Sequence, residues 1–246
     1  MSKKLNELLA NPLEGLVEAQ LNRMFVQWNS GKGIRAGIHT SSIIEPEDKF
    51  CYREQILALF CKKNQVELPV KLLRIFLHGW SVHEKWQSLF QESGVAESIE
   101  RSSLSKKWDL YLTPDAIIRL GKKRYVVEIK SMNTYQFKKL KGPPSNAVRQ
   151  AQVYMHQVSI PNAIILVEDK NDQAFKVFLI DYEPEIVRPY IERLHNISRL
   201  AKAFEEQRKL PKRICMGLKD KRAVSCQSSK ACFCGKNQRE NMILCG

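Results

Sequence analysis

The sequence lacks any apolar run approaching the roughly 20 residues that span a bilayer, so it predicts no membrane-spanning helix. Its first residues, Met-Ser-Lys-Lys-Leu-Asn-Glu, contain no apolar signal core, and we therefore expect a cytoplasmic protein. Internal repeats and low-complexity tracts are also absent. Hydrophobic residues make up 43% and aromatic residues 9% of 246 residues, which excludes a disordered or fibrous chain and is enough for one large domain with a small appendage.

Acidic residues are scarce beside basic ones. The chain has 26 Asp and Glu against 40 Lys and Arg, a formal net charge of +14. Runs of basic residues are usually solvated surface, but this excess is more than solubility needs, so we expect DNA as a partner and some of these runs at its phosphates. The basic runs are Lys106-Lys107, Lys122-Lys123-Arg124, Lys219–Arg222 and the DNA-binding candidates Lys138, Lys139 and Lys141.

Seven cysteines are distributed unevenly along the chain. Cys51 and Cys61 lie early, and the other five follow from residue 215 onward. Because the cytosol keeps thiols reduced, we do not expect a disulfide framework in a protein placed there, and the clustering favours a metal or iron–sulfur centre. The tail from residue 207 has little hydrophobic periodicity, so a metal centre would supply order that apolar burial does not.

The hydrophobic pattern predicts an α/β fold. Apolar residues recur at helical spacing over 3–28, 52–62, 71–92, 146–158 and 184–208, and short β-branched stretches cover 108–112, 115–120, 124–130, 163–168 and 174–180. This order indicates a mixed central sheet flanked by helices. We divide the chain into an N-terminal helical region (1–70), a core (71–206) and a cysteine-rich C-terminal segment (207–246) that clasps the N-terminal region.

A predicted hairpin carries the chemistry. Twelve residues separate Asp115 from Glu128, and Gly121-Lys122-Lys123 between them favours a turn, so both carboxylates lie side by side on neighbouring strands. Glu128 and Lys130 are two residues apart and leave the same face of the sheet. Two hard carboxylates aimed at one point suit Mg²⁺ or Mn²⁺, and the ammonium can orient water or stabilise a pentavalent phosphate. The arrangement predicts metal-assisted phosphodiester hydrolysis.

These motifs resemble the PD-(D/E)xK nuclease superfamily, whose core is restriction-endonuclease-like, and within it the RecB-like branch. The resemblance rests on Thr113-Pro114-Asp115-Ala116-Ile117-Ile118 and Val126-Val127-Glu128-Ile129-Lys130-Ser131, with Gly79-Trp80-Ser81-Val82-His83 before them and Gln150-Ala151-Gln152-Val153-Tyr154 after them. It implies that His83, Asp115, Glu128 and the Ile129 carbonyl hold the metal, that Lys130 and Gln150 act on the water, and that Tyr154 contacts DNA. From the residues alone, His83 and Tyr154 are open to a second interpretation as core side chains.

The cysteines are similar to those of RecB-like nucleases with an iron–sulfur cluster, among them the CRISPR-associated adaptation nucleases and phage RecB-like exonucleases. Those proteins use one cysteine before the core and three after it, which implies Cys51, Cys215, Cys226 and Cys232 as ligands of a [4Fe–4S] cluster. The usual pair two residues apart is missing, so Cys234 is an alternative to Cys215. Four thiolates also describe a structural Zn²⁺ site, and the spacing leaves that alternative open.

The sequence thus predicts a metal-dependent DNA nuclease, an exonuclease on single strands or DNA ends, serving replication, recombination or repair in the cytoplasm and nucleoid of a bacterial or phage-infected cell. Tyr135 and Phe137 are further candidates for stacking on bases or for core packing. A non-catalytic DNA-binding or assembly module with a structural zinc or iron–sulfur centre is the alternative. Whether a helicase or recombination partner, or a second copy of the chain, joins it is left open.

Overall fold

The computed structural model describes residues 12–30, 37–60, 68–100, 103–105 and 110–233. Its helices are α2 (Pro12–Ser30), α3 (Thr40–Ile43), α4 (Tyr52–Phe60), α5 (Val70–Glu92), α6 (Thr134–Lys139), α7 (Ser145–Val158), α8 (Pro184–Gln207), α9 (Lys221–Ser225) and α10 (Ser229–Phe233). Its strands are β1 (Ile38–His39), β2 (Ala96–Ile99), β3 (Ser103–Ser105), β4 (Leu110–Leu112), β5 (Ala116–Leu120), β6 (Lys123–Met132), β7 (Asn162–Asp169) and β8 (Phe175–Asp181). Within these ranges no helix is long and apolar enough to cross a membrane.

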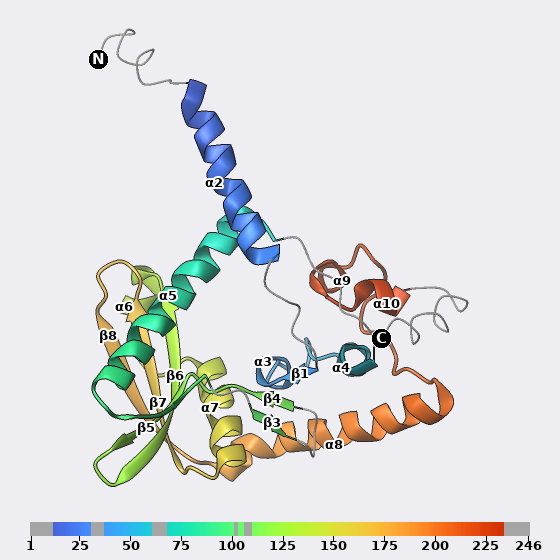
Figure 1. The fold of residues 1–246 in the computed structure, drawn as a ribbon. Coiled ribbons are helices and arrows are strands. Elements are labelled where there is room, and N and C mark those ends of the chain that lie inside the picture. Colours follow the sequence, from blue (N-terminus) through green and yellow to red (C-terminus); the bar gives the residue numbers. More distant parts are fainter. Residues whose placement is uncertain (1–11, 31–36, 61–67, 101–102, 106–109, 234–246) are drawn as a thin grey trace.

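A five-stranded sheet forms the centre of the fold, with the strand order β2-β5-β6-β7-β8. The β6–β7 pair is parallel and the other three pairs are antiparallel. Parallel neighbours need a crossover connection, which here contains α6 and α7. Strands β1, β4 and β3 form a second, small sheet. The mixed sheet flanked by helices agrees with the prediction (Figure 1).

Helices cover both faces of this sheet, and the alternation along β6 decides which side chains meet which helix. Val127 and Ile129 join a buried cluster with Val82 of α5. Val126 joins the larger cluster that contains Ala151 of α7. Because successive strand residues point to opposite faces, Glu128, two residues after Val126, lies on the α7 side of the sheet. The strand therefore directs a charged side chain into the layer between sheet and helix.

The C-terminal part of the described chain returns to the N-terminal part. Arg193 of α8 donates from Nη1 to the Ile43 carbonyl at 2.8 Å. Arg53 of α4 donates from Nη1 to the Pro211 carbonyl at 2.8 Å, and α10 contacts α4. Figure 1 shows α9 and α10 beside α4, apart from the central sheet. Two buried arginines, one on α4 and one on α8, therefore connect segments more than a hundred residues apart in sequence.

Several short elements were not predicted. Strands β2 and β3 are only four and three residues long and include polar residues, which is why a hydrophobic pattern missed them. Helix α6 was missed as well, although Asn133 caps it by accepting from the Gln136 N–H at 2.9 Å. Helix α7 begins at Ser145, one residue before the Asn146 expected as its cap. The predicted β5–β6 hairpin is confirmed, and its turn contains Gly121 at φ +60°.

Candidate functional site

The hairpin sets the first two carboxylates side by side. Ala116 pairs with Val127 in the β5–β6 register, so Asp115, just before β5, lies opposite Glu128. The Ile129 backbone N–H donates to Asp115 Oδ2 at 2.6 Å. A carboxylate that accepts a backbone N–H is held in one orientation. Asp115 therefore presents its other oxygen, Oδ1, away from the strand.

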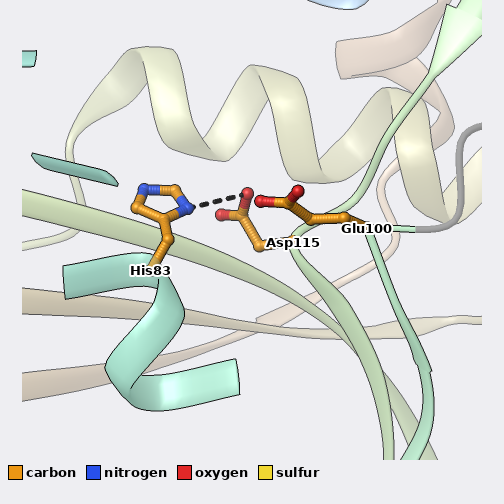
Figure 2. Close-up of side chains that lie close together, drawn as sticks. All are labelled: His83, Glu100 and Asp115. Atoms are coloured by element: carbon orange, nitrogen blue, oxygen red, sulfur yellow. Dashed lines mark ion pairs between the residues drawn. The ribbon is translucent and has the colours of Figure 1, made fainter. Parts of the chain in front are cut away.

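Helix α5 brings His83 to that oxygen. His83 Nδ1 lies 3.1 Å from Asp115 Oδ1. Figure 2 shows the His83 ring facing the Asp115 carboxylate. Burial alone would lower the pKa of His83, but the hydrogen bond to Asp115 and the charges of Asp115 and Glu128 outweigh it and raise the pKa. Imidazole beside a carboxylate is a donor set that divalent metals accept. The structure thus places His83 among the acidic side chains, and the core interpretation of this residue does not describe its surroundings.

Lys130 and Gln150 lie beside Glu128 on the α7 side of the sheet. Lys130 Nζ forms an ion pair with Glu128 Oε1 and lies 3.3 Å from Gln150 Oε1. Gln150 in turn donates from Nε2 to the Tyr154 hydroxyl at 3.0 Å. Burial alone would lower the pKa of Lys130, but the neighbouring Glu128 charge raises it, so the amine stays protonated. The four side chains form one connected polar row.

Glu128 is the best test of whether this group fits a cation. The residue is 1% exposed, and its Oε2 atom is buried with no hydrogen-bond donor. Burial and the Asp115 charge raise the pKa of Glu128 to about 7, although Lys130 opposes that rise. A buried carboxylate oxygen without a partner is costly. A divalent cation at this oxygen would remove the cost, so the donor set fits Mg²⁺ or Mn²⁺.

These side chains line one open cleft of about 560 Å³. Helix α5 supplies Ile75, Phe76 and Trp80 to its wall, and Lys170 is a further lining residue. The residues predicted from the sequence that line it are His83, Asp115, Glu128, Ile129, Lys130, Gln150 and Tyr154. Tyr154 is only 3% exposed, and burial together with the Glu128 charge raises its pKa well above the usual range. Its hydroxyl rather than its ring face is directed at the polar row.

Two residues of this site had not been predicted. Glu100 follows β2, and one of its carboxylate oxygens lies within 4.8 Å of ligand atoms of His83 and Asp115. Gln87, one helical turn after His83, donates from Nε2 to Glu100 Oε1 at 3.1 Å and to the Asp115 carbonyl at 3.0 Å. Neither belongs to a spaced motif. The position of Gln87 four residues after His83 is the one signal that could have indicated it.

The four cysteines implied by the resemblance line a second, smaller cavity. Cys51, from the start of α4, and Cys215, Cys226 and Cys232, from the C-terminal segment, surround about 40 Å³. Arg53 donates from Nε to Cys232 Sγ at 3.2 Å, and Cys226 Sγ donates to Glu54 Oε1 at 3.3 Å. The structure thus brings together thiols that are over 160 positions apart. Cys61, Cys234 and Cys245 lie outside the described residues.

The thiol chemistry and spacing of this cavity bear on what it can hold. Burial, followed by the Glu54 charge, raises the pKa of Cys226 to about 12, and burial also raises the pKa of Cys51 and Cys215. In the described part of the chain, the metal-compatible group with ligand atoms within 4.8 Å is His83, Glu100 and Asp115, and no cysteine trio forms a second one. Four thiols that line one cavity suit a thiolate-bound metal centre, either zinc or an iron–sulfur cluster.

The basic and aromatic candidates around α6 lie in different surroundings. Phe137 is 7% exposed and belongs to the core, where Lys176 Nζ lies 4.6 Å from its ring centroid. Tyr135 is 69% exposed, and Lys139 Nζ lies 4.0 Å from its ring centroid. Lys138 and Lys139 are in the last turn of α6, and Lys141 follows the helix. None of these lysines lines the cleft, while Lys106 and Lys107 lie outside the described residues.

No protein-family model matches the chain, and no curated protein sequence does. Among solved structures, the chain is similar to an alkaline exonuclease from Laribacter hongkongensis at 14% identity and a TM-score of 0.50, covering 70% of this chain and 93% of that one. The same exonuclease in complex with dAMP gives 14% identity and a TM-score of 0.51, covering 69% and 90%. A protein designated SSO0001 aligns at 15% identity and a TM-score of 0.48, covering 75% and 88%. The chain therefore shares the α/β fold of the Laribacter enzyme, a mixed sheet flanked by helices.

Proposed function

We propose that this protein is a metal-dependent deoxyribonuclease that hydrolyses phosphodiester bonds at unpaired DNA ends. The observation that carries the proposal is the convergence of Asp115 and Glu128 on one cleft, with a buried Glu128 oxygen that has no donor. Binding without cleavage does not require two carboxylates aimed at one point, since phosphates repel them. The similarity to an alkaline exonuclease supports the same reaction class through the fold.

Each side chain has a separate task in this proposal. His83, Asp115 and Glu128, with the Ile129 carbonyl, would hold Mg²⁺ or Mn²⁺, which when bound polarises the phosphate and acidifies water. Lys130, which pairs with Glu128 in the cleft, would place its ammonium group beside the phosphate. Gln150 accepts from Lys130 and holds the ammonium group in place. In this proposal the bound metal ion and the Lys130 ammonium group would stabilise the negative charge that develops on the phosphate oxygens.

The aromatic wall of the cleft supports an unpaired substrate. Phe76 and Trp80 are 49% and 43% exposed, and both line the cleft on the helix that carries His83. Positions 76, 80 and 83 are four and three residues apart, so the rings and the imidazole share one face of α5. Stacking on an exposed aromatic ring suits any base that is free of its partner strand. The two rings are better placed for stacking than Phe137, which packs in the core.

Cleavage of end-labelled DNA tests the proposal. The protein with Mn²⁺ should degrade single strands, and EDTA should stop the reaction. Asp115→Asn and Glu128→Gln should each lower the rate at least about 100-fold, because a metal ligand is lost. Glu206→Gln, in a carboxylate that is 57% exposed on α8, is the matched control and should leave the rate unchanged. DNA binding without any metal-dependent cleavage would instead favour the non-catalytic module.

We also propose that Cys51, Cys215, Cys226 and Cys232 hold a structural [4Fe–4S] cluster that fastens the C-terminal segment to α4. The shared cavity supports a common centre, and the resemblance to RecB-like nucleases with an iron–sulfur cluster favours a cluster over a single zinc ion. Arg53, which donates to Cys232 Sγ, would then be a hydrogen-bond donor that tunes the cluster. Its other contact, to the Pro211 carbonyl, holds the backbone of the same segment.

The spectrum and metal content of anaerobically purified protein test this second proposal. A cluster predicts a brown protein that absorbs broadly near ~400 nm, as thiolate-ligated iron does. Cys51→Ser and Cys226→Ser should both bleach it and destabilise the fold, since each removes a ligand of one centre. If Cys234→Ser loses the brown colour and Cys215→Ser keeps it, then Cys234 and not Cys215 is the fourth ligand. Colourless protein with one equivalent of zinc would replace the cluster with a zinc site.

A further inference from the structure

We infer that Glu100 is a further metal-binding carboxylate of this cleft, joining His83 and Asp115 around the divalent cation. The inference rests on the proposed function, because it concerns the same cation. Figure 2 shows the Asp115 carboxylate between the His83 ring and the Glu100 carboxylate. One ligand atom from each of the three residues lies within 4.8 Å of the other two, and Glu100 lines the cleft. An oxygen-rich set at this spacing matches the coordination of Mg²⁺ or Mn²⁺.

Hydrogen bonds hold Glu100 next to Asp115, where a third ligand of the cation would lie. Gln87 is 6% exposed, and its Nε2 donates both to Glu100 Oε1 at 3.1 Å and to the Asp115 carbonyl at 3.0 Å. The Glu100 N–H donates to that same carbonyl at 3.2 Å. One buried amide therefore fixes Glu100 relative to Asp115, and the free Glu100 oxygen remains available to a cation. Outer residues that orient metal ligands have this arrangement.

The backbone of Glu100 is unusual as well. Its φ is +37°, in the left-handed region that residues with a Cβ avoid. Such a conformation persists only where neighbouring contacts enforce it, here the hydrogen bond from the Glu100 N–H to the Asp115 carbonyl and the one that Glu100 Oε1 accepts from Gln87. Glu100 follows β2 directly, and it lines the cleft.

A further observation indicates a cation rather than an incidental acidic cluster. Glu128 Oε2 is buried and lacks a donor, and Glu128 lines the same cleft as Glu100. A cation bound among these carboxylates would supply the partner that this buried oxygen lacks.

Mn²⁺ binding to the full-length protein without DNA tests the inference, with titration calorimetry and the electron paramagnetic resonance of free Mn²⁺ as readouts. Glu100→Gln should weaken Mn²⁺ binding at least about tenfold, and Asp115→Asn should weaken it further. Glu97→Gln is the matched control, because Glu97 also lies on the β2 segment but pairs with Arg119 and Arg124 and does not line the cleft. It should bind within about twofold of wild type.

Thermal unfolding in EDTA separates a ligand from a structural residue. A metal ligand predicts that Glu100→Gln unfolds at the wild-type temperature in EDTA but gains less stability from Mn²⁺. If that variant fails to fold, Glu100→Asp, which keeps the charge, should fold and bind Mn²⁺ with intermediate affinity. If Glu100→Gln binds Mn²⁺ with wild-type affinity while Asp115→Asn binds it more weakly, Glu100 is not a ligand, and only this inference is overturned. Absence of Mn²⁺ binding by the wild-type protein would overturn the proposed function with it.

Discussion

Arg53 should contribute more to stability than any exposed arginine of this chain, and Arg53→Met tests this directly. The side chain is 7% exposed and donates to the Pro211 carbonyl at 2.8 Å and to Cys232 Sγ at 3.2 Å. Hydrogen bonds from a charged donor contribute about 1.5–3 kcal/mol each, and a sulfur acceptor is the weaker of the two. Methionine keeps most of the aliphatic volume but leaves the carbonyl without this donor. We therefore expect a loss of about 3 kcal/mol.

The assay is guanidinium chloride unfolding of the anaerobically purified protein, followed by far-ultraviolet circular dichroism. The metal content of both variants is measured first, so that a change in stability can be assigned to the hydrogen bonds. Arg188→Met is the matched control, because Arg188 pairs with Glu185 while their side chains are 62% and 70% exposed, so it should change stability little. Equal midpoints for the two variants would refute the reasoning. An unchanged slope of free energy against denaturant would show that both fold to the same extent.

Three other outcomes follow from the same structure. The logarithm of DNA affinity should fall linearly with the logarithm of salt concentration, because the +14 charge displaces counterions; a slope near zero would contradict a phosphate-tracking role. Phe76→Ala and Trp80→Ala should each weaken binding of single strands by about 1–3 kcal/mol in fluorescence anisotropy and affect duplex ends less, whereas equal losses on both would exclude stacking. The Cys226 thiol, with its pKa raised to about 12, is protonated in metal-free protein, so Zn²⁺ uptake should release protons and strengthen from about pH 6 to 8; a pH-independent affinity would contradict this.

The hairpin could be predicted because its signals are local. A turn containing Gly121 and alternating apolar residues define the register, and the register alone puts Asp115 opposite Glu128. The same alternation sends Glu128 and Lys130 to one face. The position of His83 required more than periodicity, since an apolar helix face normally buries a histidine in a core. The order of motifs in the resembling family supplied that information.

Glu100 and Gln87 were not predictable for a physical reason. Glu100 follows a four-residue strand without clear alternation, and its place in the cleft depends on a positive φ and on a hydrogen bond from α5. Both are tertiary effects that leave no spacing in the sequence. The cysteines are the opposite case, because Cys51 could be grouped with the C-terminal thiols from the resemblance alone. Arg53 joins these two segments, but no sequence motif indicates this role, and only the structure reveals it.

The central claim is that the cleft beside Glu128 uses a divalent cation to cleave DNA. The most direct test is the initial rate of phosphodiester cleavage of single-stranded DNA as free Mn²⁺ is varied, for wild type and Glu128→Gln. We predict a rate that rises with Mn²⁺ and saturates in the wild-type protein, and a variant at least about 100-fold slower at every concentration. Cleavage that continues in EDTA, or a variant with the wild-type curve, would contradict the account.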